Sequence, residues 1–414
     1  MIGEVTLTRP RYTQLRSERV MALGPMCMSH PLPTPRLSLQ GYIKPNLGVL
    51  TTRWSIVQSP WLAFVTYGFM FGLGIGTAYM APLSCGMRWF PENKGLVNGI
   101  IVGGFGLGAF IFNFAHTAYL NPENKVVSSS GYFTDEDILN RVPSLFLIMG
   151  GTYAVIQVIG CLLLKNPPQH FEQEREGIRV KNHQNYGTIM EPGNNEVDGV
   201  IDLLSLSEED SSLSPSQVLR TRELWMLWLT FFFNQQAVGY ISTMYKPFGQ
   251  TFISNDRYLS VVGAIAALFN SFGRIFWGKL MDDTSYKLAM TMVTGLLMAE
   301  FFSLLATSLG GELMFTIWIF AIYATFCGTF VLLPTVTYQT FGPTYASLNY
   351  GIVFSNTVFS APLTSILTQY LSEDFGWFGI FCLLAGFAFL SVLLTYFYPD
   401  NPSPQLIRGR MSET

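Results

Sequence analysis

Two polar residues inside an apolar run are the best placed in this chain to bind an anion. Arg274 and Asn270 both lie in the run at 258–279, with Asn270 four residues earlier on the same helical face. Arg274 precedes Asp282 by about eight residues, hence roughly 12 Å along a helix axis. A guanidinium offers paired donors that match a carboxylate. These residues therefore predict a site for the carboxylate of a small organic anion.

A structural role for Arg274 is the alternative. An arginine well inside a membrane span costs on the order of 2.5–3.5 kcal/mol on insertion scales, so some partner must offset it. The side chain could extend toward the cytosolic face and form a clamp with Asp282 or Asp283. The sequence leaves both roles open.

Further polar side chains lie inside apolar runs, where they are costly and usually face a cavity or a neighbouring helix. Those expected to contact substrate beside Arg274 and Asn270 are Gln235, Gln236, Tyr240, Tyr79, Asn349, Tyr350 and Asn356. For the amides, interhelical hydrogen bonds remain the alternative. We favour snorkelling or an interhelical bond over a proton relay for Glu300, and an interfacial anchor over a ligand for Lys246.

Other chemistries find little support in the residue types. No nucleophile, base and orienting group combine into a catalytic set, so we do not expect an enzyme. The four histidines and five cysteines are not spaced as metal ligands or as a disulfide framework, and no cofactor is expected. The segment Gly104–Gly108 alternates glycines as a phosphate-binding loop does. It lies inside a continuous apolar run with no strand before it, which argues against nucleotide binding.

Composition sets the class of protein. The chain has 414 residues, of which 49% are hydrophobic and only 12% charged, against about 25% charged in soluble domains. A net charge of −3 indicates no nucleic-acid partner. We therefore expect an all-α polytopic protein whose surroundings are the lipid bilayer.

Nine apolar runs are long enough to span a membrane. They lie at 60–85, 95–118, 143–164, 222–245, 258–279, 287–307, 313–334, 346–370 and 377–398. The domain organisation that follows is a basic irregular tail (1–54), a partial N-terminal bundle of three spans (55–165), a polar and mostly disordered cytosolic linker (166–221), a six-helix bundle (222–399) and a cytosolic tail (400–414). Acidic residues in the loop at 119–142 place that loop on the side opposite the linker.

The first two runs are joined by a short polar segment, Arg88–Lys94, which we call an elbow. The stretch around it occurs a second time in the chain, in degenerate form. The positions Gly76, Pro82, Pro91 and Gly99 correspond to Gly328, Pro334, Pro343 and Gly351, each pair 252 residues apart. Trp89 falls on Phe341 at the same offset. Such a repeat implies two pseudo-symmetric helical halves, as in many secondary transporters. The first half then lacks counterparts of three helices, so we expect that the gene model is truncated or that the tail replaces them.

The linker is expected to end in an ordered helix start. Ser214 is a candidate N-cap, Pro215 occupies the first helical position and Gln217 completes a capping box. These residues predict a helix that continues into Trp225.

Several of these segments resemble one transporter family. Gly278-Lys279-Leu280-Met281-Asp282-Asp283 is similar to the G-x-L-x-D gating loop of the major facilitator superfamily, with Gly278 and Asp282 at the motif positions. The elbow W-F-P-x-x-x-G-L and the glycines after it resemble the oxalate:formate antiporter and monocarboxylate carrier branch. The segments at 349–351 and 273–278 fit the same branch. The resemblance implies a twelve-helix rocker-switch carrier with a central cavity, to which this chain contributes nine helices.

One departure from the family pattern bears on the substrate. Oxalate-handling relatives place a lysine near the position of Thr357, whereas this chain has no basic residue between Lys287 and Arg408. A monocarboxylate held by one cation is therefore favoured over a dianion, together with a co-transported or exchanged ion. The rival class is a non-transporting membrane protein, either receptor-like or a truncated isoform. The coupling ion and the membrane, plasma or organelle, stay open.

Overall fold

The structure is a computed structural model that describes residues 79–123, 135–165, 212–400 and 402–412, with positions 62, 65 and 66. All regular structure within these ranges is helical. The first part comprises α5 (Met80–Trp89), α6 (Lys94–Leu120) and α7 (Glu136–Leu163). The second part comprises α10 (Pro215–Val218), α11 (Arg222–Gly249), α12 (Asp256–Asp283), α13 (Tyr286–Leu304), α14 (Thr307–Phe326), α15 (Thr329–Phe341), α16 (Ala346–Phe354), α17 (Thr357–Ile366), the π-helix η2 (Leu367–Leu371), α18 (Ser372–Tyr396) and α19 (Pro404–Ser412).

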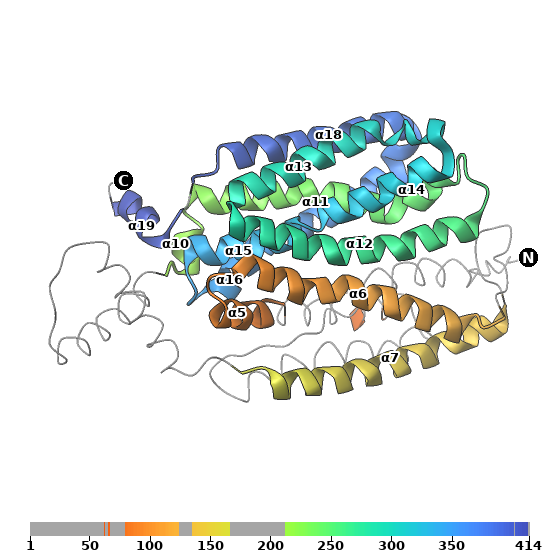
Figure 1. Cartoon of the computed structure of the whole chain (residues 1–414), viewed down its shortest axis with the longest axis horizontal. Coiled ribbons are helices and arrows are strands. Elements are labelled where there is room, and N and C mark those ends of the chain that lie inside the picture. The colour runs from red at the N-terminus through yellow and green to blue at the C-terminus, as the bar shows by residue number, and fades with distance from the viewer. Residues whose placement is uncertain are drawn as a thin grey trace, which may run out of the picture.

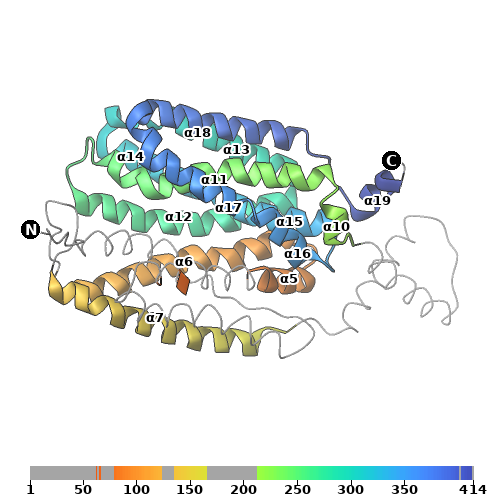
Figure 2. The same ribbon diagram turned by 180° about the vertical axis from the view of Figure 1, so that it is seen from behind.

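The long helices run side by side in one elongated bundle. Figures 1 and 2 both show α6 between α12 and α7, with α13 and α18 on the far side of α11 and α12. The short helices α5, α10, α16 and α19 gather with α15 at one end. Because the two elbows lie there, at 90–93 and 342–345, we call it the elbow end.

Seven stretches of the described chain are long and apolar enough to cross a membrane. They are Lys94–Phe112, Glu136–Gly160, Arg257–Asp283, Tyr286–Leu304, Thr307–Phe341, Ala346–Gln369 and Phe375–Tyr396. Each corresponds to one of the nine predicted runs. Of the other two, α11 is a 28-residue helix made more polar by Asn234, Gln235 and Gln236. The run at 60–85 lies largely outside the described residues, so the count of nine is not confirmed.

The helix boundaries follow the internal repeat. Trp89 and Phe341 end α5 and α15, and Lys94 and Ala346 begin α6 and α16. Both pairs are separated by the 252 residues seen in the sequence repeat. Pro91 and Pro343 stand at equivalent places after the two helix ends, where a missing backbone N–H costs no helical hydrogen bond. The two elbows are therefore structural equivalents.

Glycines bring α6 directly against α12. A Cβ on Gly95 would overlap the backbone oxygen of Gly278, and a Cβ on Gly99 would overlap that of Arg274. One turn further along, the Ser271 hydroxyl donates to the carbonyl of Gly103. Close approach of this kind is what small residues permit in membrane helices. Gly95, Gly99 and Gly103 recur every four residues and therefore lie on one face of α6.

Two predicted helices are interrupted. The capping box at Ser214 forms, with the Ser214 N–H donating to Gln217 Oε1 at 2.9 Å. The helix does not continue into Trp225, because α10 ends at Val218 and Thr221 caps a new helix by accepting from the Leu224 N–H.

The predicted run at 346–370 is divided into α16 and α17. Three consecutive side chains at the division, of Ser355, Asn356 and Thr357, donate to carbonyls three residues earlier at 2.7, 2.7 and 2.9 Å. Such bonds compete with the helical pattern of the backbone.

The described residues that flank 166–211 bond to the ends of α5 and α15. Trp89 Nε1 donates to the Lys165 carbonyl at 2.7 Å, and the Leu213 N–H donates to the carbonyl of Phe341 at 2.9 Å. Trp89 and Phe341 are equivalent under the repeat. The C-terminal end of α6 and the N-terminal end of α7 lie at the opposite end of the bundle (Figure 1).

Candidate functional site

Arg274 is buried at the junction of three helices. Its side chain belongs to α12, is 2% exposed, and donates from Nη1 to the Val102 carbonyl of α6 at 2.6 Å. The guanidinium carbon lies 5.5 Å from the ring centroid of Phe330 in α15, a cation–π arrangement. The cation therefore sits between the first part of the chain, through α6, and the second part, through α12 and α15.

Aromatic side chains complete the surroundings of Arg274. Tyr79, just before α5, stacks on Tyr350 of α16 with ring centroids 5.7 Å apart, and its hydroxyl donates to the Phe330 carbonyl at 3.2 Å. Phe354 stacks on Tyr79 at 6.0 Å. Tyr79 and Tyr350 both lie in the neighbourhood of Arg274. We call Arg274, Phe330, Tyr79, Tyr350 and Phe354 the Arg274 cluster. Of these residues, Arg274, Tyr79 and Tyr350 were predicted from the sequence.

The predicted gating-loop residues join α12 to α6. Asp282 accepts the backbone N–H groups of Gly95 at 2.8 Å and Leu96 at 2.7 Å, at the start of α6. A carboxylate is stabilised there by unpaired N–H groups and the helix dipole. The close approach of Gly278 to Gly95 permits this contact.

The structural alternative for Arg274 required a pair with Asp282 or Asp283. Asp282 is instead bonded to α6, and Asp283 accepts from Lys279 Nζ at 2.6 Å. Arg274 points to Val102, so the clamp is not the arrangement observed.

Other predicted residues bond within or between helices away from the cluster. Asn270 donates to the Tyr323 carbonyl of α14 at 3.2 Å. Asn349 donates to the Leu213 carbonyl at 3.0 Å, which ties α16 to the segment before α10.

Three further predicted residues lie beside α17 and α18. Gln236 bridges α11 and α17, since its Oε1 accepts from Thr364 at 3.0 Å. Asn356 donates to the Val353 carbonyl of its own turn at 2.7 Å. Tyr240 is fully buried and packs edge-on against Phe381 of α18. For Glu300, Oε1 accepts from Thr325 at 2.7 Å, the interhelical bond favoured from the sequence.

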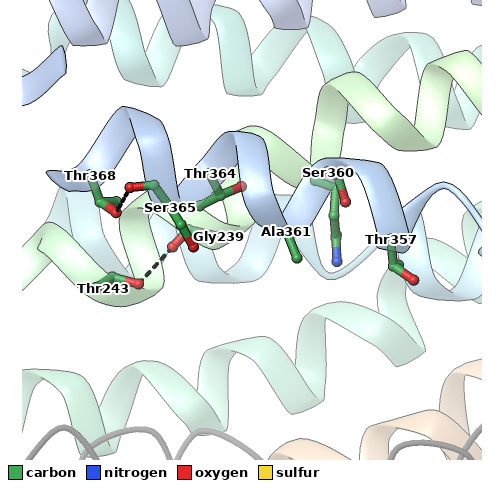
Figure 3. A pocket seen from close by; sticks show the side chains of 9 residues that line it. Gly239, Thr243, Thr357, Ser360, Ala361, Thr364, Ser365 and Thr368 are labelled. Carbon is green, nitrogen blue, oxygen red and sulfur yellow. Dashed lines mark hydrogen bonds between the residues drawn. The ribbon is translucent and has the colours of Figure 1, made fainter. Parts of the chain in front are cut away.

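Gln235 lines a polar pocket of about 200 Å³ between α11 and α17. Figure 3 shows Gly239 and Thr243 of α11 facing the hydroxyl side chains of α17 and η2. The full lining is Gln235, Gly239, Thr243, Thr357, Ser360, Ala361, Thr364, Ser365 and Thr368.

Sequence reasoning missed most of this pocket, together with Val102 and Phe330. The α17 hydroxyls recur every three or four residues, a spacing that places them on one helix face and that would have revealed them. Nothing in the sequence marks a particular backbone carbonyl such as that of Val102 as the partner of a guanidinium.

Comparison with known proteins now decides the family. The model of the Major Facilitator Superfamily matches residues 47–361. The chain belongs to the Major Facilitator Superfamily. An integral, multi-pass membrane protein with an all-α fold is thereby confirmed, as the resemblance implied.

Curated relatives agree with the branch suggested by the sequence. The chain is 28% identical over 362 residues to apicoplast pyruvate carrier 1 of Toxoplasma gondii, covering 83% of this chain and 66% of that protein. It is 22% identical over 329 residues to the oxalate:formate antiporter of Oxalobacter formigenes, covering 79% and 67%. The chain thus spans about two thirds of the length of these relatives. Their names describe transporters rather than enzymes.

Solved structures share the fold. The fucose:proton symporter FucP of E. coli matches with a TM-score of 0.60 at 12% identity, covering 94% of this chain and 87% of FucP. The proton:xylose symporter XylE matches with the same TM-score and identity over 96% and 87%.

Proposed function

We propose that this chain is a secondary active carrier of a small organic anion, in the first place a monocarboxylate, that works by alternating access. The observation that carries the proposal is the buried guanidinium of Arg274 between α6 and α12, framed by aromatic rings. The names of the relatives, a pyruvate carrier and an oxalate:formate antiporter, support a carboxylate substrate.

The Arg274 cluster supplies the chemistry for one carboxylate. A charge-assisted bond from a guanidinium to a carboxylate is roughly twice as strong as a neutral hydrogen bond, so a substrate oxygen competes well with the Val102 carbonyl. Tyr79 and Tyr350 add hydroxyls and apolar ring surface beside the same cation. One cation balances one carboxylate, whereas a dianion asks for a second cation that the sequence does not supply between Lys287 and Arg408.

Asp282 couples this site to the movement of the two halves. Arg274 and Asp282 lie on the same helix, and both contact α6, at Val102 and at Gly95 with Leu96. Rocking of one half against the other must separate α6 from α12 at the elbow end and break the Asp282 contacts. A substrate that pulls Arg274 away from Val102 loosens the same interface, which links binding to opening.

Uptake into proteoliposomes tests the proposal. Purified chain is reconstituted, and uptake of radiolabelled pyruvate, lactate, formate and oxalate is measured with and without unlabelled substrate inside. We expect uptake of monoanions, little of oxalate, and loss of uptake in Arg274→Gln. Stimulation by internal substrate indicates exchange. Saturable binding without uptake would favour the receptor-like or non-transporting class, and absence of both would refute the substrate class.

A further inference from the structure

One face of α6 runs from the elbow end to the Arg274 cluster and meets the second part of the chain along the way. Lys94, Asn98 and Val102 recur every four residues of α6 and therefore share this face. At the elbow end, Lys94 Nζ lies 5.1 Å from the ring centroid of Tyr338 in α15. At Val102, roughly 12 Å further along the helix, the carbonyl accepts from Arg274. Along α6, Asn98 lies midway between these two contacts.

Asn98 bonds directly to α15. Its Nδ2 donates to Thr335 Oγ1 at 2.7 Å, and both residues are completely buried. The Thr335 hydroxyl donates its own proton to the Val331 carbonyl at 2.7 Å, so toward Asn98 it can only accept. This arrangement assigns the amide nitrogen, rather than the amide oxygen, to the side of Thr335. The bond therefore joins the first part of the chain, through α6, to the second part, through α15.

The amide oxygen of Asn98 is less well placed than the amide nitrogen. Asn98 Oδ1 is buried and lacks a hydrogen-bond partner among the described residues. The nitrogen has the Met87 sulfur, a weak acceptor, as a further neighbour at 3.5 Å. A buried carbonyl oxygen without a partner costs at least as much free energy as one net hydrogen bond contributes. The Asn98–Thr335 bond thus stabilises the closed interface only slightly.

We propose that Asn98 and Thr335 form a polar gate between the Arg274 cluster and the elbow end, and that this pair keeps the closed and open conformations close in free energy. Opening of the elbow end separates α6 from α15 and breaks the bond. Two apolar residues in these positions would gain burial free energy in the closed conformation alone, which favours closure. A polar pair is hydrated again on opening, and Asn98 Oδ1 then finds a partner in water. The use of this gate in transport rests on the proposed function.

The distance between the two elbows measures the gate without any substrate. Glu92 of the first elbow and Tyr345 of the second are both exposed. In a chain without its five native cysteines, Glu92→Cys and Tyr345→Cys carry spin labels. Double electron–electron resonance on the purified chain then gives the populations of short and long distances, which correspond to closed and open elbow ends. We expect the short distance to predominate in the chain that retains Asn98 and Thr335.

Three gate variants should change the two populations in different directions. Thr335→Val keeps the size of the side chain and removes the oxygen that accepts from Asn98, so the open-to-closed ratio should rise about tenfold. Asn98→Leu combined with Thr335→Val makes both partners apolar, and the ratio should fall about fivefold below that of the unaltered chain. Thr335→Ser keeps the acceptor and should leave the ratio unchanged.

Thr337→Val is the matched control. Thr337 is equally buried in α15, and its hydroxyl bonds the Leu333 carbonyl of its own helix at 2.7 Å, so this change should not alter the ratio. The inference is overturned if Thr335→Val behaves as Thr337→Val does, or if the double variant opens as readily as Thr335→Val alone.

The same measurement separates the gate from the proposed function. The expected ratios in a chain that takes up no monocarboxylate would support the gate and refute the proposed function. Uptake of monocarboxylate by a chain whose ratio does not respond to Thr335→Val or to the double variant would overturn the gate and leave the proposed function intact.

Discussion

Arg274 owes its position to contacts that replace water around a charged group. The Val102 carbonyl accepts one of its protons, and the Phe330 ring faces the cation at 5.5 Å. In such apolar surroundings a charge interacts more strongly with its neighbours than in water. A carboxylate arriving there meets a donor group already held in place, which lowers the cost of binding.

Replacing Arg274 tests the geometry of that donor. Arg274→Lys keeps the charge but loses the paired donors, so the apparent affinity for pyruvate should fall about tenfold, and in Arg274→Gln about a hundredfold. Radiolabelled uptake and substrate-induced shifts in Tm measure both. Arg257→Gln, an exposed position on the same helix, is the control. Unchanged affinity in both Arg274 variants, with normal insertion, would make the residue structural.

The sequence identified Arg274, Tyr79 and Tyr350 as candidates because polar groups within apolar runs are few. It could not separate them from Asn349 or Tyr240, which bond to Leu213 and pack on Phe381. That separation depends on the rotation of each helix about its axis, which the packing of neighbouring helices decides. Hydropathy alone contains no such information.

Among the helices, α6 and α12 share the interface that contains both the contact of Arg274 and the contacts of Asp282. Gly95 and Gly99 admit the backbone of α12, and Asp282 binds the first turn of α6. Arg274 contacts α6 at Val102, which follows Gly95 and Gly99 along that helix. Closure at the elbow end and the position of Arg274 are thus set by the same pair of helices.

Gly99→Ala tests this close packing. An added Cβ would overlap the backbone oxygen of Arg274, and backbone cannot move aside as a side chain can. We expect destabilisation of about 1–3 kcal/mol, as for other overpacking, together with weaker substrate binding. The matched control is Gly104→Ala in the same helix, where a Cβ meets nothing within 4 Å. Equal effects of the two variants on Tm would contradict this account.

Asp282→Asn tests the contact with the start of α6. Loss of the charge weakens an interaction typically worth 0.3–1 kcal/mol at a helix N-terminus, so the elbow end should open more often. A single cysteine in place of Lys94, at the start of α6, should then react faster with a maleimide. Asp283→Asn is the control, because Asp283 pairs with the exposed Lys279 on its own helix. Equal reactivity in both backgrounds would argue against a gating role.

The element boundaries that proved predictable are those marked by backbone-special residues. The runs expected to begin at 313 and 377 follow Gly311 and Gly376, whose positive φ values of 62° and 60° end the preceding turns. The 252-residue repeat located both elbows. The break between α16 and α17 escaped prediction because it arises from side chains that bond their own turn, a competition that apolar periodicity does not register.

For the molecule as a whole, contacts between segments that are distant in the sequence gather at the elbow end. Both flanks of the segment at 166–211 bond the elbows, and Arg410 of the C-terminal α19 pairs with the buried Glu223 of α11 at 2.6 Å. Basic residues cluster there, including Arg220, Lys279 and Lys287. Positive charge in short loops favours the cytoplasmic face. We therefore propose that the elbow end faces the cytosol.

Single-cysteine labelling tests this sidedness for the entire chain. Glu92 in the first elbow and Asp137 at the start of α7 are both exposed and lie at opposite ends of α6. In a background without the five native cysteines, Glu92→Cys and Asp400→Cys should be protected from a membrane-impermeant maleimide in intact cells and react after permeabilisation. If the chain resides in the plasma membrane, Asp137→Cys should react in intact cells. If it resides in an organelle membrane, sealed organelles are labelled instead, and there Glu92→Cys and Asp400→Cys should react while Asp137→Cys is protected. Reaction of Glu92→Cys and Asp137→Cys from the same side would contradict this topology. It would also contradict the placement of both elbows at one face of the membrane.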